Sequence, residues 1–385
     1  MFKKILSVVL AVAMIASLCV VFASCQTGNA DFKLGVILLH DEFSTYDLNF
    51  MNGIEEARIA LGLSEDQVII KKNIPESNDC YEAACDLIDE GCDVIFADSF
   101  GHETYLIKAA KENPDVEFCH ATGTMAHTSG LDNFHNAFAA IYEGRFLAGV
   151  AAGLKLNEMI DSGKITAEEA KMGYVGAFTY SEVMSGYTSF YLGAKSVCPS
   201  VTMDVQFTGS WYDVTAEKNA AEALLARDCV LISQHADSMG APGACEAAGV
   251  PNVSYNGSTY DACPETFIVS SAINWAPYYV YITKCYVNNE AIATNWCGGI
   301  EEGSVVLSGI NLDVAAEGTV EAINDAIAKL KDGSLKVFAA DTFTVGGAAA
   351  ESTLVFDGYF HESEAISAPS FDLRIDGITL LNEKY

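Results

Sequence analysis

Short apolar runs alternate with helical patterns along most of this chain, and the alternation occurs twice. Residues 33–39 and 171–177 are buried-strand runs that both begin Lys-x-Gly, and an amphipathic helical stretch follows each of them. Further on, an Ala-Ala helix, a cysteine, an apolar strand and the tetrapeptide Asp-Ser-x-Gly recur in the same order, ending at residues 98–101 and 237–240. A recurrence of several landmarks at a nearly constant offset predicts a duplicated structural unit.

Each unit is predicted to be a parallel sheet with helices on both faces. Strands of five to seven residues separated by helices favour this arrangement over an antiparallel one. We therefore expect an α/β protein of two doubly wound parallel-sheet lobes joined by a multi-strand hinge. The first lobe is predicted to comprise residues 33–140 plus about 272–305, and the second residues 141–271 plus about 306–385.

The final third of the chain does not repeat. Apolar runs at residues 267–272 and 304–310 flank a helical stretch, and we expect them to cross between the lobes as the hinge. Residues 313–334 are predicted to form one further amphipathic helix that ends at Gly333. The acidic segment 357–381 is predicted to form surface strands and loops.

The amino terminus has the pattern of an export signal. Lys3 and Lys4 precede an apolar run over residues 5–21, which ends in small residues and Cys25 before a polar stretch. This pattern predicts a signal peptide over residues 1–24 and not a membrane span. Cys25 resembles the lipidated first residue of a bacterial lipoprotein, with residues 25–32 as its tether. An ordinary cleaved signal followed by a coincidental cysteine remains the alternative.

Composition narrows the classes of function. The chain has 385 residues, and half of these residues are apolar. It carries 52 acidic and 21 basic side chains, which give a formal net charge of −31. Such a chain folds readily, has no basic surface for nucleic acid, and is expected to be a monomer because its copies repel one another. Several of the 12 cysteines lie in apolar runs, as do Cys119 and Cys229, and are expected to be buried thiols, although one or two disulfides are possible.

Motifs for cofactor or metal chemistry are absent from the sequence. It contains no phosphate-binding loop, dinucleotide-binding glycine motif, zinc-peptidase motif or CxxC pair, so we expect no cofactor and no metal. One enzyme hypothesis stays open. Ser99 lies between a strand and a helix, as the nucleophile of an α/β hydrolase does, and His235 or His361 would complete its triad. The second Asp-Ser-x-Gly, which includes Ser238, favours a structural turn instead.

The loops after the strands are expected to line a cleft between the lobes, because ligands of open α/β sheets bind at the carboxyl ends of the strands. Aromatic rings in such a cleft enclose a flat ligand, and carboxylates accept hydrogen bonds from hydroxyl or N–H groups. Core packing is the alternative for each ring, and His235 is expected to be a loop histidine without a ligand. The residues predicted to contact ligand are Asp41, Phe43, Tyr46, Asp47, Ser99, Phe100, Phe178, Trp211, Asp237, Asn256 and Trp275.

Six segments carry a family resemblance. They are residues 95–101, 113–123, 141–149, 208–213, 234–238 and 274–279. In this order they resemble the basic membrane protein family of ABC-transporter substrate-binding lipoproteins, which includes purine nucleoside receptors. The resemblance extends over about residues 33–310 and implies a type I periplasmic-binding-protein fold. It gives Asp41, together with Phe43 or Tyr46, the part of the base-contacting pair, and it places Asn256 where relatives often have aspartate.

The function that this resemblance implies is ligand binding without catalysis. We expect an extracytoplasmic lipoprotein, anchored to the bacterial cell membrane, that closes over a nucleoside-like solute. It would deliver the solute to the permease subunits of an ABC importer, whose ATPase is a separate chain. A ligand sensor that feeds a membrane signalling partner is the alternative, and a secreted hydrolase that uses Ser99 is a weaker one.

Overall fold

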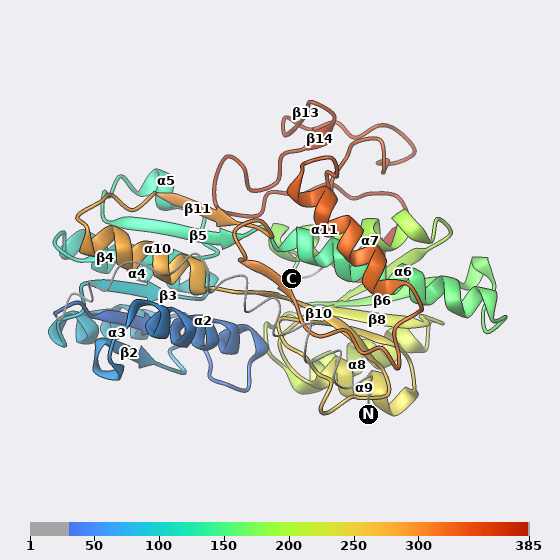
Figure 1. Ribbon diagram of the computed structural model, residues 1–385, viewed down its shortest axis with the longest axis horizontal. Helices are drawn as coiled ribbons and strands as arrows, with labels where there is room; N and C mark the ends of the chain where they lie inside the picture. Colours follow the sequence, from blue (N-terminus) through green and yellow to red (C-terminus); the bar gives the residue numbers. More distant parts are fainter. Residues whose placement is uncertain (1–30, 384–385) are drawn as a thin grey trace.

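Two parallel sheets, each covered by helices on both faces, form the body of the protein (Figure 1). The computed structural model describes residues 31–383, so the predicted signal peptide, the lipidation site at Cys25 and most of the tether lie outside the described residues. Within residues 31–383 no helix has the length and apolar character needed to cross a bilayer. We call each sheet with its helices a lobe.

The first sheet has six strands, all parallel. In spatial order they are β11 (Asn295–Gly298), β5 (Phe134–Ala139), β4 (Glu117–Ala121), β3 (Val94–Ala97), β1 (Leu34–Ile37) and β2 (Val68–Lys71). The central strands β1 and β3 are buried at every position. Burial on both faces explains why they are continuous apolar runs in the sequence.

The second sheet has seven strands and repeats the order of the first. Its strands are β12 (Val305–Leu307), β10 (Phe267–Ile273), β9 (Asn252–Tyr255), β8 (Leu231–His235), β6 (Lys171–Gly176), β7 (Thr202–Phe207) and β15 (Ile378–Leu380). Only β12 runs antiparallel to its neighbour. The order β7-β6-β8-β9-β10 matches β2-β1-β3-β4-β5, so the duplication predicted from the sequence is confirmed.

Helices complete both lobes, and their apolar faces form separate cores on the two sides of each sheet. The first lobe carries α2 (Thr45–Leu61), α3 (Asn78–Asp89), α4 (Glu103–Glu112), α5 (Ala126–Ser129) and α10 (Ala276–Val287). The second carries α6 (Ile141–Asp161), α7 (Ser181–Val197), α8 (Val214–Leu225), α9 (Gly240–Ala248) and α11 (Thr319–Lys331). The ten cysteines within residues 31–383 are free thiols, and eight of them are buried.

Local sequence explains where α2 begins and how α6 meets α7. The Ser44 hydroxyl accepts a hydrogen bond from the Asp47 N–H at the start of α2, and Gly62 ends the helix with a positive φ of 69°. Helices α6 and α7 approach so closely that a side chain at Gly149 or Gly193 would collide with the backbone of the other helix. Glycine at these positions is therefore a packing requirement.

Three short connections join the lobes. They lie between β5 and α6, between β10 and α10, and between β11 and β12. The apolar runs that were predicted to form the hinge are themselves strands β10 and β12, paired to each other in the second sheet. Two of the three crossings lie in the few residues next to these strands, and the third is the connection between β5 and α6.

Two predictions for the carboxyl-terminal region need correction. Helix α11 begins at Thr319 and not near residue 313, because Gly318 before it has a φ of 82°. The segment predicted to lie on the surface is partly core: Phe360 and Phe371 are buried against Phe338 in the second lobe. Strand β15 in addition extends the second sheet beside β7. Isolated phenylalanines among polar residues gave no periodic pattern to reveal this burial.

Candidate functional site

A small cavity lies between the lobes, at the carboxyl ends of the strands, with about 400 Å³ of empty space when open solvent is included. The first lobe contributes Leu39, His40, Tyr46, Asp47, Ser99, Phe100 and Thr122 to its walls, and the second contributes Glu182, Trp211, His235, Asp237, Tyr255 and Asn256. The lobes also touch directly, because the N–H of Thr45 donates to the carbonyl of Asp237 at 3.3 Å. Asn49 Nδ2 donates to Asn256 Oδ1 at 3.3 Å.

In the first lobe the cavity wall is built around the carboxylate of Asp47. Burial alone would raise its pKa, but hydrogen bonds from His40 and Ser44 outweigh burial and lower it. The His40 N–H donates to Asp47 Oδ1 at 2.7 Å, and the Ser44 hydroxyl donates to Oδ2 at 2.5 Å. Asp98 lies behind Asp47, and burial together with the charge of Asp47 raises the pKa of Asp98. The surroundings therefore favour the charged form of Asp47 and disfavour the charged form of Asp98.

In the second lobe the wall is built around Asp237 and His235. Asp237 Oδ1 accepts from Asn256 Nδ2 at 3.0 Å, and burial, followed by the nearby Glu217 charge, raises the pKa of Asp237. Burial lowers the pKa of His235, so this ring is neutral at pH 7 even though Nε2 lies 3.6 Å from Glu182. The Tyr255 hydroxyl is buried and has no hydrogen-bond partner among the described residues. Its free donor is available to a polar ligand.

Aromatic rings from both lobes contact one another next to the cavity, and two of them, Phe100 and Trp211, line it. Phe178 stacks on Tyr180 with 5.0 Å between ring centroids and meets Trp211 edge-on at the same distance. Phe100 of the first lobe lies 5.4 Å from Tyr180 of the second. Contacts of this geometry add to the apolar burial of the rings. The pair formed by Phe100, which lines the cavity, and Tyr180, which does not, joins the two lobes and is here called the ring seam.

The polar part of the cavity is acidic. Asp47, Glu182 and Asp237 contribute carboxyl groups, and none of the described residues that line the cavity is lysine or arginine. Such walls suit a ligand rich in hydroxyl or N–H donors and disfavour a phosphate or carboxylate, because anions would face unpaired acceptors. Arg145 lies behind the wall, fully buried, and bonds to Ser233 and Ser254.

Seven of the eleven residues predicted to contact ligand line this cavity: Tyr46, Asp47, Ser99, Phe100, Trp211, Asp237 and Asn256. The other four do not line it. Phe178 stands behind Trp211, and Asp41 bonds to Asn73 at the surface. Phe43 is 74% exposed, and Trp275 is buried in the first lobe, stacked on Phe50 with 4.4 Å between ring centroids.

Six further residues line the cavity although the sequence did not single them out as ligand contacts. Thr122 lies in the loop after β4, and Glu182 lies in the first turn of α7, in the region after β6; the strand-end rule already pointed to both places. Leu39 and His40 directly follow β1, and His235 and Tyr255 are the last residues of β8 and β9. His235 is thus a buried strand residue and not a loop histidine. The last residues of the strands were not predicted as ligand contacts, because an apolar run has the same sequence pattern whether its last residue faces the core or a cavity.

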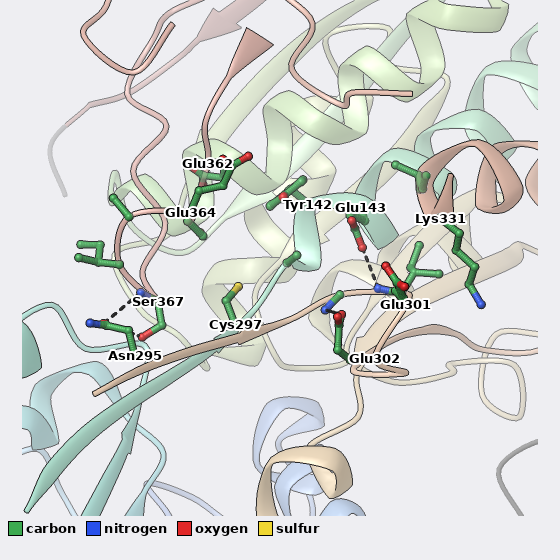
Figure 2. Close-up of a pocket in the computed structure, with 17 residues that line it drawn as sticks. Tyr142, Glu143, Asn295, Cys297, Glu301, Glu302, Lys331, Glu362, Glu364 and Ser367 are labelled. Atoms are coloured by element: carbon green, nitrogen blue, oxygen red, sulfur yellow. Dashed lines mark hydrogen bonds between the residues drawn. The ribbon is translucent and has the colours of Figure 1, made fainter. Parts of the chain in front are cut away.

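A second, larger space lies beside the hinge, between β11 and the carboxyl-terminal segment (Figure 2). It has an empty volume of about 1040 Å³ and is lined by glutamates, among them Glu143, Glu301 and Glu364, with Lys331 at one side. The Ile300 N–H donates to Glu143 Oε2 at 2.8 Å. Apart from Ala140 after β5, no residue that follows a duplicated strand lines this space, whereas residues at or after the ends of β1, β3, β4, β7, β8 and β9 line the cavity between the lobes. The cavity between the lobes is therefore the better candidate for ligand binding.

Comparisons with known proteins agree with this architecture. The family model described as "ABC transporter substrate-binding protein PnrA-like" matches residues 36–337. A purine-binding protein of Brucella abortus (strain 2308) is 31% identical over 237 residues, which are 62% of this chain and 63% of that protein. A putative ABC transporter glucose-binding protein of Haloferax volcanii is 31% identical over 253 residues, 65% of this chain and 60% of that protein.

The chain therefore spans about three fifths of the length of these two curated relatives. Among solved structures, an ABC transporter solute-binding protein of Conexibacter woesei superposes with a TM-score of 0.62. The superposition covers 79% of this chain and 98% of that one at 18% sequence identity. At this identity the likeness shows the fold alone, and it confirms the predicted periplasmic-binding-protein type.

Proposed function

The chain belongs to the family of PnrA-like substrate-binding proteins of ABC transporters, and from this premise we propose that it is the extracytoplasmic receptor of a nucleoside importer. It holds a nucleoside between its lobes, closes by rotation at the hinge and delivers the solute to membrane permease subunits. The receptor is a monomer and stays at the membrane through a lipid on Cys25. Binding proteins that close around a ligand commonly use this hinge geometry.

The observation that carries the proposal is the composition of the cavity wall. Trp211, Tyr46 and Phe100 offer aromatic surface for a base, while Asp47 and Asp237 offer acceptors for ribose hydroxyls or base N–H groups. The absence of lysine and arginine among the described lining residues favours a nucleoside over a nucleotide. The similarity to a purine-binding protein supports a purine as the base.

The surroundings of Ser99 support binding without catalysis. Its hydroxyl donates to the Glu76 carboxylate at 2.6 Å, and His120 Nε2 meets the Ser99 carbonyl and not the hydroxyl. A nucleophilic serine needs a base within hydrogen-bond reach of its hydroxyl, and a histidine in that place would complete a hydrolase. We therefore assign Ser99 to the cavity wall and to the turn that Glu76 holds.

A monosaccharide is the second candidate ligand. The similarity to a putative glucose-binding protein is as high in identity as that to the purine-binding protein. A sugar would use the same carboxyl acceptors, with its apolar face against an aromatic ring. The two candidates differ in whether the base contributes to affinity.

Calorimetric titration of the protein lacking residues 1–25 separates these possibilities. The protein is unfolded and refolded beforehand to remove bound solute, and it is titrated with adenosine, guanosine, inosine, cytidine, free purines, ribose, glucose and AMP. We expect micromolar or tighter binding of a purine nucleoside and at least tenfold weaker binding of AMP. Binding of glucose without nucleosides would move the assignment to a sugar, and equal binding of AMP would contradict the role given to the acidic wall.

A further inference from the structure

The carboxyl-terminal segment contains a loop, residues 361–370, that starts and ends in the second lobe. Phe360 before it and Phe371 after it are both buried, and their ring centroids lie 4.8 Å apart. Phe371 also stacks on Phe338 at 4.5 Å. The loop lies beyond residue 337, where the family match ends. It thus lies outside the part of the chain that the family model matches, and it is fixed at both ends by apolar packing.

The loop is braced internally. Both the N–H and the hydroxyl of Ser370 donate to Glu362 Oε2 at 2.9 Å, and the Ser363 hydroxyl donates to the Ala368 carbonyl at 3.1 Å. Glu362 is 2% exposed, and Ser363 and Ala368 are buried as well. Buried polar bonds of this kind hold a loop in one conformation. The loop can therefore transmit force between its ends and its tip.

The tip of the loop, Ser367, lies in the first lobe. It is 1% exposed and lies between Asn136 of β5 and Asn295 of β11. Asn136 Nδ2 donates to the Ser367 carbonyl at 2.7 Å, and the Ser367 N–H donates to Asn295 Oδ1 at 3.1 Å, as the dashed line in Figure 2 marks. The Ser367 hydroxyl lies within 3.0 Å of both the Asn136 carbonyl and Asn295 Oδ1.

Asn136 connects this tip to the wall of the cavity. Its side chain also accepts from the Gly123 N–H at 2.8 Å and donates to the Gly123 carbonyl at 2.9 Å. Gly123 directly follows Thr122, a cavity-lining residue held at a φ of 66°. A side chain at Gly123 would collide with Glu103 and His120, so this short turn has little freedom of its own. One amide side chain thus holds both the loop tip and the cavity wall.

We propose that residues 361–370 form a hinge strap, a fourth and non-covalent connection between the lobes that limits their separation and positions the cavity wall at Thr122 through Asn136. The three chain crossings permit rotation, because few backbone angles need to change in them. The strap adds hydrogen bonds at the β5–β11 edge of the first sheet, which must stretch or break when the lobes move there. An effect of the strap on ligand affinity rests on the proposed function, whereas its effect on how far the lobes separate does not.

The test compares Ser367→Ala with Ser370→Ala. Both remove one hydroxyl from the same loop, but Ser370 bonds only to Glu362 within the strap, whereas Ser367 bonds to the first lobe. Hydrogen exchange of the Gly123 N–H and the radius of gyration from small-angle scattering are measured on the ligand-free protein. We expect exchange about two- to tenfold faster and a larger radius in Ser367→Ala, and values close to those of the wild type in Ser370→Ala.

Asn295→Ala provides a second variant from the other side of the junction. It removes the acceptor of Ser367 and leaves the bonds between Asn136 and Gly123 in place. It should reproduce the Ser367→Ala result. If both variants match Ser370→Ala in exchange and in radius, the strap proposal is wrong. Neither measurement uses a ligand. The two measurements therefore test the strap proposal even if the protein binds no nucleoside.

Discussion

The two Asp-Ser-x-Gly turns occupy corresponding places in the two lobes and differ in use. Both follow a central strand, β3 or β8, and both are held by a glutamate that precedes or begins the neighbouring helix. Glu76 accepts from the Ser99 hydroxyl and the Gly101 N–H at 2.6 and 2.7 Å. Glu217 accepts from the Ser238 N–H at 3.2 Å. The shared part of the motif therefore builds a turn.

The side chains that reach the cavity differ between the copies. In the first lobe Ser99 and Phe100 line it, and Asp98 is withdrawn to accept from the Leu39 N–H at 3.0 Å. In the second lobe Asp237 lines it, and the exposed Met239, which corresponds to Phe100, does not. The bracing glutamates also differ, since Glu76 is exposed and Glu217 is buried. A duplicated turn fixes a position beside the ligand, and the surrounding packing decides which side chain uses it.

The largest expected difference between the copies is in the pH dependence of stability. Burial raises the pKa of Glu217 to about 7, above the ordinary glutamate value of 4.5, so between these two pH values the folded protein holds a proton that the unfolded chain releases. The stability that this proton confers is present below pH 4.5 and is lost as the pH rises toward 7, at about 1.4 kcal/mol per pH unit. Glu217→Gln should remove that slope from the free energy of unfolding measured by urea titration.

Glu76→Gln is the matched control in the first lobe. Because Glu76 is exposed, this variant should keep the wild-type slope between pH 4.5 and 7. Equal slopes in Glu217→Gln and the wild type would mean that Glu217 ionises normally and that the two braces are equivalent.

Substitutions of Asp237 and Asp98, the corresponding aspartates of the two turns, should differ in their effect on ligand affinity. Asp237→Ala removes an acceptor from the cavity wall and leaves Asn256 without its partner, so we expect at least about tenfold weaker binding of the nucleoside that the wild type prefers. Asp98→Asn keeps an oxygen for the Leu39 N–H and should change affinity less than about twofold. Isothermal titration at pH 7 measures both. Similar losses in the two variants would place Asp98 in contact with ligand.

The smallest effect is expected at the ring seam. Phe100→Ala removes the contact with Tyr180 across the lobes, and an aromatic pair contributes about 0.5–1.5 kcal/mol. Affinity for the same nucleoside should fall by about two- to tenfold, mainly through faster dissociation in stopped-flow experiments. Met239→Ala, the corresponding position of the second copy, should leave dissociation unchanged. A faster rate in Met239→Ala alone would reverse the assignment of the seam.

Periodic patterns made the fold predictable, and their absence explains what was missed. The buried strands, the duplicated turns and the loops at the strand ends follow from apolar runs and from the recurrence of Asp98 and Asp237. Trp275 also follows a strand, but it precedes α10 and packs on Phe50, which no local pattern encodes. Tyr255 was not predicted as a cavity residue, because a strand that ends in the core and a strand that ends at a cavity have the same apolar pattern. Ser367 contacts residues 231 positions away, beyond the reach of any pattern.

The ring seam has a kinetic consequence. In the proposed receptor, a solute in the cavity leaves when the lobes part, because Phe100, which lines the cavity, contacts Tyr180 of the other lobe. Its residence time is then set by how often the lobes open, while its equilibrium occupancy also depends on the carboxyl groups inside. The two quantities can be tuned by different residues, so evolution can lengthen the hold on a solute without altering the groups that recognise it.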